Sequence, residues 1–140
     1  MLTDENRQRF AELADVLIPS ALGMPSASEA AVPDRWLDEA LRHRSDLEPG
    51  LLEALAAAPN LAPAEAIEVL NKDHIPAFEA LGTLAAGAYF LNPEIRTLIG
   101  YPGQVPTPAR DDTSEYLDLL ENVMERGQVY RDVVAPRVGS

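Results

Sequence analysis

The sequence predicts an all-α protein: a single compact bundle of about six or seven helices, with a proline-rich loop before the last long helix. Apolar residues recur at three- and four-residue spacing along most of the chain, and prolines, glycines and capping residues separate these stretches. No stretch alternates strictly between apolar and polar residues, and no Asn-Gly or Asp-Gly pair predicts a hairpin. With 140 residues, the chain is long enough to bury a core as one domain, 1–140.

The first predicted helix begins after Thr3 and ends before Pro19. The Thr3 side chain can cap this helix, and the two acids in its first turn suit the helix dipole. A loop of small residues, 19–28, is expected to follow. Four apolar residues share one face of the helix: Phe10, Leu13, Ala14 and Leu17.

Three more helices are predicted before the middle of the chain. Ser28 can cap a first turn that Pro33 interrupts, and a stronger helix then runs from Pro33 to Arg44. A short helix is expected over 51–58, and Pro63 opens the next one. Their apolar residues are Trp36, Leu37, Ala40 and Leu41 in the first, Leu51, Leu52 and Leu55, all inward, in the second, and Ile67, Val69 and Leu70 in the third.

The bundle is expected to form around residues 73–104. A long helix in this stretch is apolar over so much of its surface that it belongs in the middle of a domain. Small residues within it, among them Gly82 and Gly87, would let neighbouring helices approach closely. Its apolar positions are Phe78, Leu81, Leu84, Ala85, Ala88 and Leu91.

A short helix and a stiff turn follow the central helix. The pair Asn92-Pro93 supplies an N-cap and a first-turn proline for a helix over 94–99, and Gly100 can end it in the left-handed conformation. Residues 101–104, Tyr-Pro-Gly-Gln, come next. A tyrosine in a loop stiffened by proline and glycine is preorganised contact surface, typical of binding interfaces. The alternative is a loop that folds back over its own helices, with Tyr101 as a plug.

Prolines hold residues 101–112 in an extended, non-helical conformation before the last helix. Asp112 or Thr113 can cap that helix, and Glu115 resembles the second residue of a capping box. Gly127 is expected to weaken it near its end. One face is predicted to be buried, with the residues Tyr116, Leu119, Leu120, Val123 and Met124.

Composition and charge exclude several classes of protein. The chain is 46% hydrophobic and 24% charged, which excludes wholesale disorder. Its net charge of −12 disfavours nucleic acid and anionic membranes as partners, because phosphate binding needs clustered lysine and arginine. No cysteine is present, so neither a disulfide nor a thiolate site can form. The longest apolar run, 84–91, is far shorter than the roughly 20 residues that cross a bilayer, so membrane insertion is not expected.

The sequence contains no convincing catalytic pattern. Neither a P-loop nor a G-x-G-x-x-G is present. The two histidines, His43 and His74, lack the spacing of a metal-binding helix, and the paired acids lie on the polar side of predicted helices. We therefore predict no catalytic, cofactor-binding or metal-binding residue in this chain.

Four segments resemble the gluconate 2-dehydrogenase subunit 3 family, the small subunits of flavin-dependent sugar dehydrogenases. They are ELADVLIPS at 12–20, SASEAAVPDRWLDEAL at 26–41, GAYFLNPEIRTLIGYPGQ at 87–104 and ERGQVYR at 125–131. The family pattern has an opening helix that ends in Ile-Pro, a pair of aromatics, a short helix with a proline, and then Gly-Tyr-Pro-Gly. The order and spacing of these pieces are similar over most of the chain.

The resemblance implies a noncatalytic accessory subunit. Members pair with a large flavoprotein of the glucose–methanol–choline oxidoreductase type, which carries FAD and oxidises a sugar, polyol or sugar acid. Many members begin with a twin-arginine export signal; this sequence shows none, so a cytoplasmic complex is expected. The residues expected to meet or support the large subunit are Tyr101, Pro102, Gly103 and Gln104, with Tyr89, Phe90 and Asn92 behind them.

Two other kinds of protein fit the composition. One is a free-standing metal-assisted enzyme that uses His43, His74 and nearby acids, and the other is a homo-oligomeric structural helical protein. Bound metal that a double His→Ala variant loses would favour the first, and self-association of the isolated chain would favour the second.

Overall fold

A computed structural model describes residues 2–106 and 113–127 of the chain. Its described part is all-α, as predicted, and contains no strand. The chain divides into two compact units, Met1–Gln104 and Val105–Ser140, which are described separately below. The helices are α1 (Asp4–Leu17), α2 (Leu37–His43), α3 (Glu48–Ala57), α4 (Pro63–Asp73), α5 (Ile75–Leu91), α6 (Pro93–Leu98) and α7 (Thr113–Arg126), with an irregular turn at Val32–Trp36 and a 3₁₀ turn at Ser45–Leu47.

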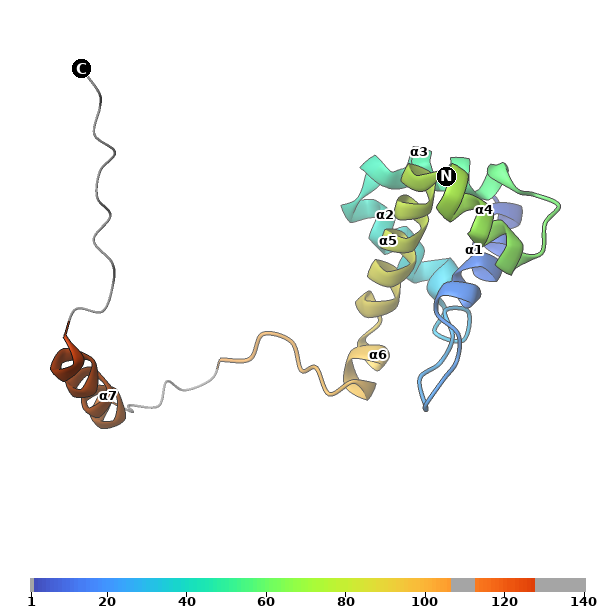
Figure 1. The fold of residues 1–140 in the computed structure, drawn as a ribbon. Helices are drawn as coiled ribbons and strands as arrows, with labels where there is room; N and C mark the ends of the chain where they lie inside the picture. The colour runs from blue at the N-terminus through green and yellow to red at the C-terminus, as the bar shows by residue number, and fades with distance from the viewer. Residues whose placement is uncertain (1, 107–112, 128–140) are drawn as a thin grey trace, which may run out of the picture. The chain divides into compact units, whose positions relative to one another are not determined.

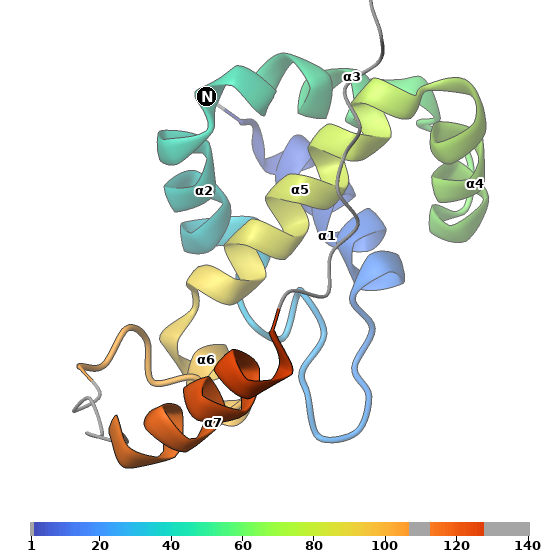
Figure 2. The same ribbon diagram turned by 60° about the vertical axis from the view of Figure 1, so that its left-hand side comes forward.

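Helix α5 is the centre of the first unit. It contacts α1, α2, α3, α4, α6 and the irregular turn, and it runs through the unit between α2 and α4 (Figures 1 and 2). Helices α1 and α3 pack against it as well. The predicted central position of this helix is confirmed. Its buried residues are Ala77, Ala80, Leu81, Leu84, Ala85, Ala88 and Tyr89.

A glycine allows a close approach between α3 and α5. Gly50 lies within α3, and a Cβ built on it would lie 2.9 Å from the Cβ of Ala80 in α5. Gly82 and Gly87, by contrast, have open space where a Cβ would be. The expectation that these two glycines allow close packing is wrong, because they lie on faces of α5 that no described helix covers closely.

The predicted buried faces of α3 and α7 differ from the described exposure of their residues. Leu52 is 41% exposed, because the core side of α3 is set by Leu51, Ala54 and Leu55. Helix α7 belongs to the second unit, and no other described helix of that unit covers its apolar face. The five residues predicted to be buried there, Tyr116, Leu119, Leu120, Val123 and Met124, are therefore more than half exposed. The predicted cap Asp112 lies outside the described residues.

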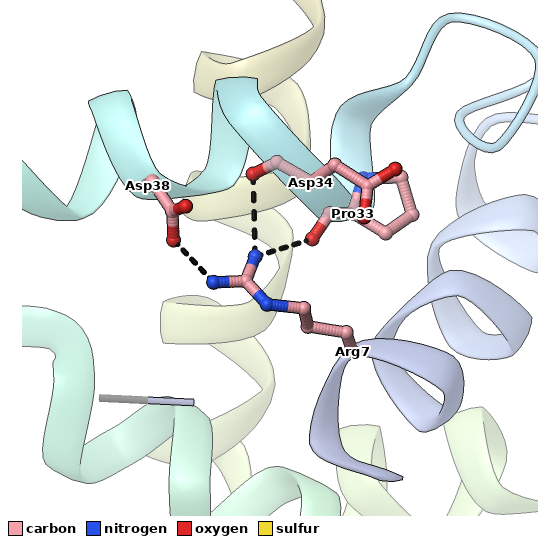
Figure 3. Close-up of polar contacts among 4 residues, drawn as sticks. All are labelled: Arg7, Pro33, Asp34 and Asp38. Atoms are coloured by element: carbon pink, nitrogen blue, oxygen red, sulfur yellow. Dashed lines mark hydrogen bonds and ion pairs between the residues drawn. The ribbon is translucent and has the colours of Figure 1, made fainter. Parts of the chain in front are cut away.

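The predicted helix from Pro33 to Arg44 is interrupted. Asp34 has φ −100° and ψ −111°, which is not helical, so the regular helix α2 begins only at Leu37. At the break, the Leu37 N–H donates to the carbonyl oxygens of Asp34 and Val32. Arg7 of α1 adds further bonds at this turn: its guanidinium donates to the carbonyl oxygens of Pro33 (2.9 Å) and Asp34 (3.3 Å) and to the Asp38 carboxylate (2.6 Å; Figure 3).

Arg9 joins α1 to another part of the first unit in the same way. It donates to the carbonyl oxygens of Ala58 (2.7 Å) and Leu61 (3.1 Å) after α3, and to Glu12 within α1 (2.9 Å). The side chains of Arg7 and Arg9 are only 21% and 15% exposed. Both arginines lie off the apolar face in the sequence pattern, yet they bind the first helix to the loops around it.

Within the described residues, no helix is long and apolar enough to cross a membrane.

Candidate partner-binding surface

The loop predicted to contact a partner, residues 101–104, is fixed at its start by hydrogen bonds to the end of α6. Gly100 has φ +71°, and its N–H donates to the carbonyl oxygen of Thr97 (3.0 Å). The N–H of Tyr101 donates to the carbonyl oxygen of Arg96 (2.8 Å). These two bonds form a Schellman motif, the usual way in which a glycine ends a helix. The backbone of Tyr101 is therefore fixed relative to α6.

The loop itself is largely open to solvent. The Tyr101 side chain is 51% exposed, so it is not a plug over the core. Pro102 and Gln104 are exposed, and Gly103 is partly exposed with φ +87°. The sequence-based alternative, a loop that folds back with Tyr101 covering its own helices, does not agree with this exposure.

Asn92 and Tyr89 are buried, and both side chains form hydrogen bonds with other segments of the unit. The side-chain oxygen of Asn92 accepts from the Glu94 N–H (2.9 Å), which caps α6 as predicted, and its amide donates to the carbonyl oxygen of Ala30 (3.1 Å). The Tyr89 hydroxyl donates to the carbonyl oxygen of Pro25 (2.8 Å). Both residues therefore connect the α5–α6 region to the loop after α1.

Burial and the nearby carboxylate of Glu29 both raise the pKa of Tyr89 above its ordinary value, burial being the larger cause. The hydroxyl thus stays protonated and remains a hydrogen-bond donor at neutral pH. Phe90 packs edge-to-face on Tyr89, with 5.6 Å between ring centroids and 85° between ring planes, and is itself 53% exposed.

We call the group of exposed apolar side chains around α6 the α6 surface. It consists of Phe90, Leu98, Ile99 and Tyr101, each about half exposed or more. The predicted site residues thus divide in two: Phe90 and the 101–104 loop are largely exposed, whereas Tyr89 and Asn92 are buried and bond to the loop after α1. Sequence reasoning missed Leu98 and Ile99, because their spacing in a short helix fits either a buried or an exposed face.

Arg96 lies on the same short helix. It is partly buried, its Nε has no hydrogen-bond partner, and it forms no ion pair with any residue that the structure describes. Four other arginines of the unit have acidic partners: Arg7 pairs with Asp38, Arg9 with Glu12, Arg42 with Glu39 and Arg44 with Asp46, whereas Arg35 lies over the ring of Trp36. Arg96 is thus a positive charge beside the α6 surface that no described carboxylate neutralises.

The histidines do not come together with acids into a metal-binding group. His43 lies 3.3 Å from Glu39 and His74 lies 3.4 Å from Glu53, each pair on its own part of the unit. Among the described residues, no three His, Cys, Asp or Glu side chains lie close enough to hold a metal ion. The described geometry thus gives the metal-assisted enzyme no defined site.

No family model matches this chain, and neither do any curated proteins or solved structures. The resemblance to the gluconate 2-dehydrogenase subunit 3 family therefore stays a hypothesis that depends on the quoted segments alone. The geometry of the α6 surface provides a separate, physical argument about binding.

Proposed function

We propose that this chain is a noncatalytic accessory subunit that binds the large, FAD-carrying flavoprotein of a sugar, polyol or sugar-acid dehydrogenase. The observation that carries the proposal is the α6 surface: Tyr101 stands half exposed on a backbone fixed by a Schellman motif, beside three further exposed apolar side chains. The family resemblance of 87–104 supplies the kind of partner.

The physical argument for binding concerns entropy. A tyrosine carries a large apolar area with few rotatable bonds, and a loop that is already ordered loses little freedom on association. Tyr101 has both properties, because its own N–H and that of Gly100 bond back to α6. A surface of this kind can contribute binding energy without rearrangement of the subunit.

Charge around the surface is consistent with a protein partner. The α6 surface is mostly apolar and lies beside Arg96, which has no ion-pair partner among the described residues. We expect a carboxylate of the flavoprotein to pair with this guanidinium at the edge of the interface. The chemistry of sugar oxidation belongs, in this proposal, to the flavoprotein and its FAD.

Isolation of the tagged chain from its native organism tests the proposal. The expected result is a yellow complex with a roughly equimolar large flavoprotein, identified by its flavin absorption spectrum and by mass spectrometry. A colourless chain recovered alone under gentle salt conditions would contradict the proposal.

A further inference from the structure

A two-residue turn projects from the first unit after α1. Ala21 and Met24 exchange two backbone hydrogen bonds, of 3.1 and 2.8 Å, across the turn. The two residues between them both have positive φ, +51° for Leu22 and +85° for Gly23. This is the backbone of a type I′ turn, which favours Asn, Asp or Gly at both central positions.

Leucine is an unfavourable residue at this position, because its backbone conformation is strained and its side chain gains no packing in return. The left-handed conformation brings its Cβ close to the following carbonyl oxygen, a strain that glycine avoids and asparagine tolerates. The Leu22 side chain is also fully exposed, so no packing in the folded chain offsets that strain. Backbone strain that the fold does not need is a reason to look for a function at the strained residue.

The loop that carries Leu22 is firmly held at its base. Ser26 and Glu29 form a reciprocal capping box: the Ser26 N–H donates to Glu29 Oε2 (2.8 Å), and the Glu29 N–H donates to Ser26 Oγ (3.3 Å). The Ser28 N–H donates to Asp15 of α1 (2.8 Å), and the Tyr89 hydroxyl donates to the Pro25 carbonyl (2.8 Å). The turn is thus presented by an ordered support.

The turn lies at the same end of the unit as the α6 surface. In both ribbon views the loop after α1 projects beside α6 (Figures 1 and 2). The residues of the turn and Leu98 of α6 line one open hollow of about 620 Å³, with Glu29 at its edge. Leu22 is therefore continuous with the α6 surface through Leu98.

We propose that Leu22 is a second anchor of the interface and inserts into an apolar pocket of the flavoprotein, a pocket with basic residues at its rim. This inference rests on the proposed function. A pocket of that kind suits a projecting leucine, and basic residues complement Glu29 and the net charge of −12. The same charge opposes association of two copies of this chain, because each would repel the other.

The variant Leu22→Asn tests the anchor, because it should weaken binding without lowering the stability of the folded chain. Asparagine adopts the left-handed conformation readily, so the thermal midpoint of the isolated chain should stay the same or rise. The amount of flavoprotein retained by the tagged variant should fall about tenfold or more, as for an anchor residue at the centre of an interface. Leu22→Gly should behave in the same way.

Leu61→Asn is the matched control. Leu61 is an exposed leucine in the loop between α3 and α4, and this loop lies away from α6 in both views. Its variant should retain the flavoprotein as the unmodified chain does. Circular dichroism of each variant shows whether it is folded.

The possible outcomes separate this inference from the proposed function. If the unmodified chain retains the flavoprotein and both Leu22 variants retain it equally, the anchor is wrong and the proposed function stands. If the unmodified chain retains no flavoprotein, the proposed function fails and the anchor fails with it. If light scattering shows a dimer that Leu22→Asn dissociates, the occupant is a second copy of this chain and the inference is overturned.

Discussion

The hydroxyl of Tyr89 donates a hydrogen bond to the carbonyl oxygen of Pro25 across 64 positions of the sequence, at 2.8 Å. This bond connects the central helix α5 to the loop that presents Leu22. Asn92 makes a second connection nearby through the carbonyl oxygen of Ala30. The end of the unit that carries the α6 surface is therefore held together by two buried side chains that were predicted as interface support.

Replacing Tyr89 with phenylalanine should lower the free energy of unfolding by about 1 kcal/mol, the usual contribution of one hydrogen bond. The ring stays buried, so only the bond to Pro25 is lost. Urea unfolding of the two proteins at neutral pH measures the difference. Equal midpoints and slopes would show that the bond does not hold the loop.

The raised pKa of Tyr89 also predicts a dependence of stability on pH. The folded state holds this proton more strongly than the unfolded state, whose tyrosine pKa is about 10. The contribution of the Tyr89 hydroxyl to the free energy of unfolding is thus fully present below about pH 10. It is lost as the pH rises from there through the pKa of the folded state. Unfolding curves from pH 8 upward should show a steeper loss for the unmodified chain than for Tyr89→Phe. Parallel losses in the two proteins would contradict this assignment.

Gly50→Ala should destabilise the first unit by about 1–3 kcal/mol, because the new methyl group would lie 2.9 Å from the Cβ of Ala80. The partner atom is a short, stiff side chain, so α3 and α5 must move apart. Gly82→Ala is the matched control: it has open space and lies inside α5, so it should stabilise the helix by about 0.5–1 kcal/mol. Thermal unfolding that moves in the same direction for both variants would disprove the close approach.

Arg7→Met should cost about 1–3 kcal/mol of stability, since it removes the donor to the Pro33 carbonyl oxygen, one of two donors to the Asp34 carbonyl oxygen, and the bond to the Asp38 carboxylate. Arg42→Met is a suitable comparison, because Arg42 is exposed and pairs with Glu39 within its own helix α2. That variant should stay within about 0.5 kcal/mol of the unmodified chain. Chemical denaturation of both variants makes the comparison, and similar losses would mean that Arg7 acts only as another surface charge.

Tyr101→Ala should weaken binding to the flavoprotein by about 1–3 kcal/mol, as truncation of an anchor does. The isolated variant should keep its stability within about 0.5 kcal/mol, because the side chain is half exposed and its backbone bonds remain. Binding measured by calorimetry, together with a thermal unfolding curve, checks both parts. Unchanged affinity in a folded variant would remove Tyr101 from the interface.

The sequence predicted the helix ends best, because they depend on residues that are close together in the chain. Thr3 caps α1 through the Asn6 N–H, and Asn92 caps α6 through the Glu94 N–H, both as predicted. Gly100 ends α6 in the left-handed conformation, with φ +71°, as predicted. Each of these features depends on the chemistry of a few consecutive residues, which a single sequence contains.

Features that depend on distant residues were missed. The break at Asp34 has a partner 27 positions away: Arg7 donates to the Asp34 carbonyl oxygen, which also accepts from the Leu37 N–H. The role of Gly50 becomes visible only when Ala80 lies opposite it. The turn at Leu22 was not predicted either, because leucine is the wrong residue for its backbone, and that mismatch is the observation behind the second anchor.

Titration of the purified chain into the purified flavoprotein tests the central claim most directly. The proposal predicts saturable binding that Tyr101→Ala and Leu22→Asn both weaken, while Leu61→Asn binds as the unmodified chain does. If the folded, unmodified chain gives no saturable binding to the flavoprotein, the accessory-subunit proposal is contradicted.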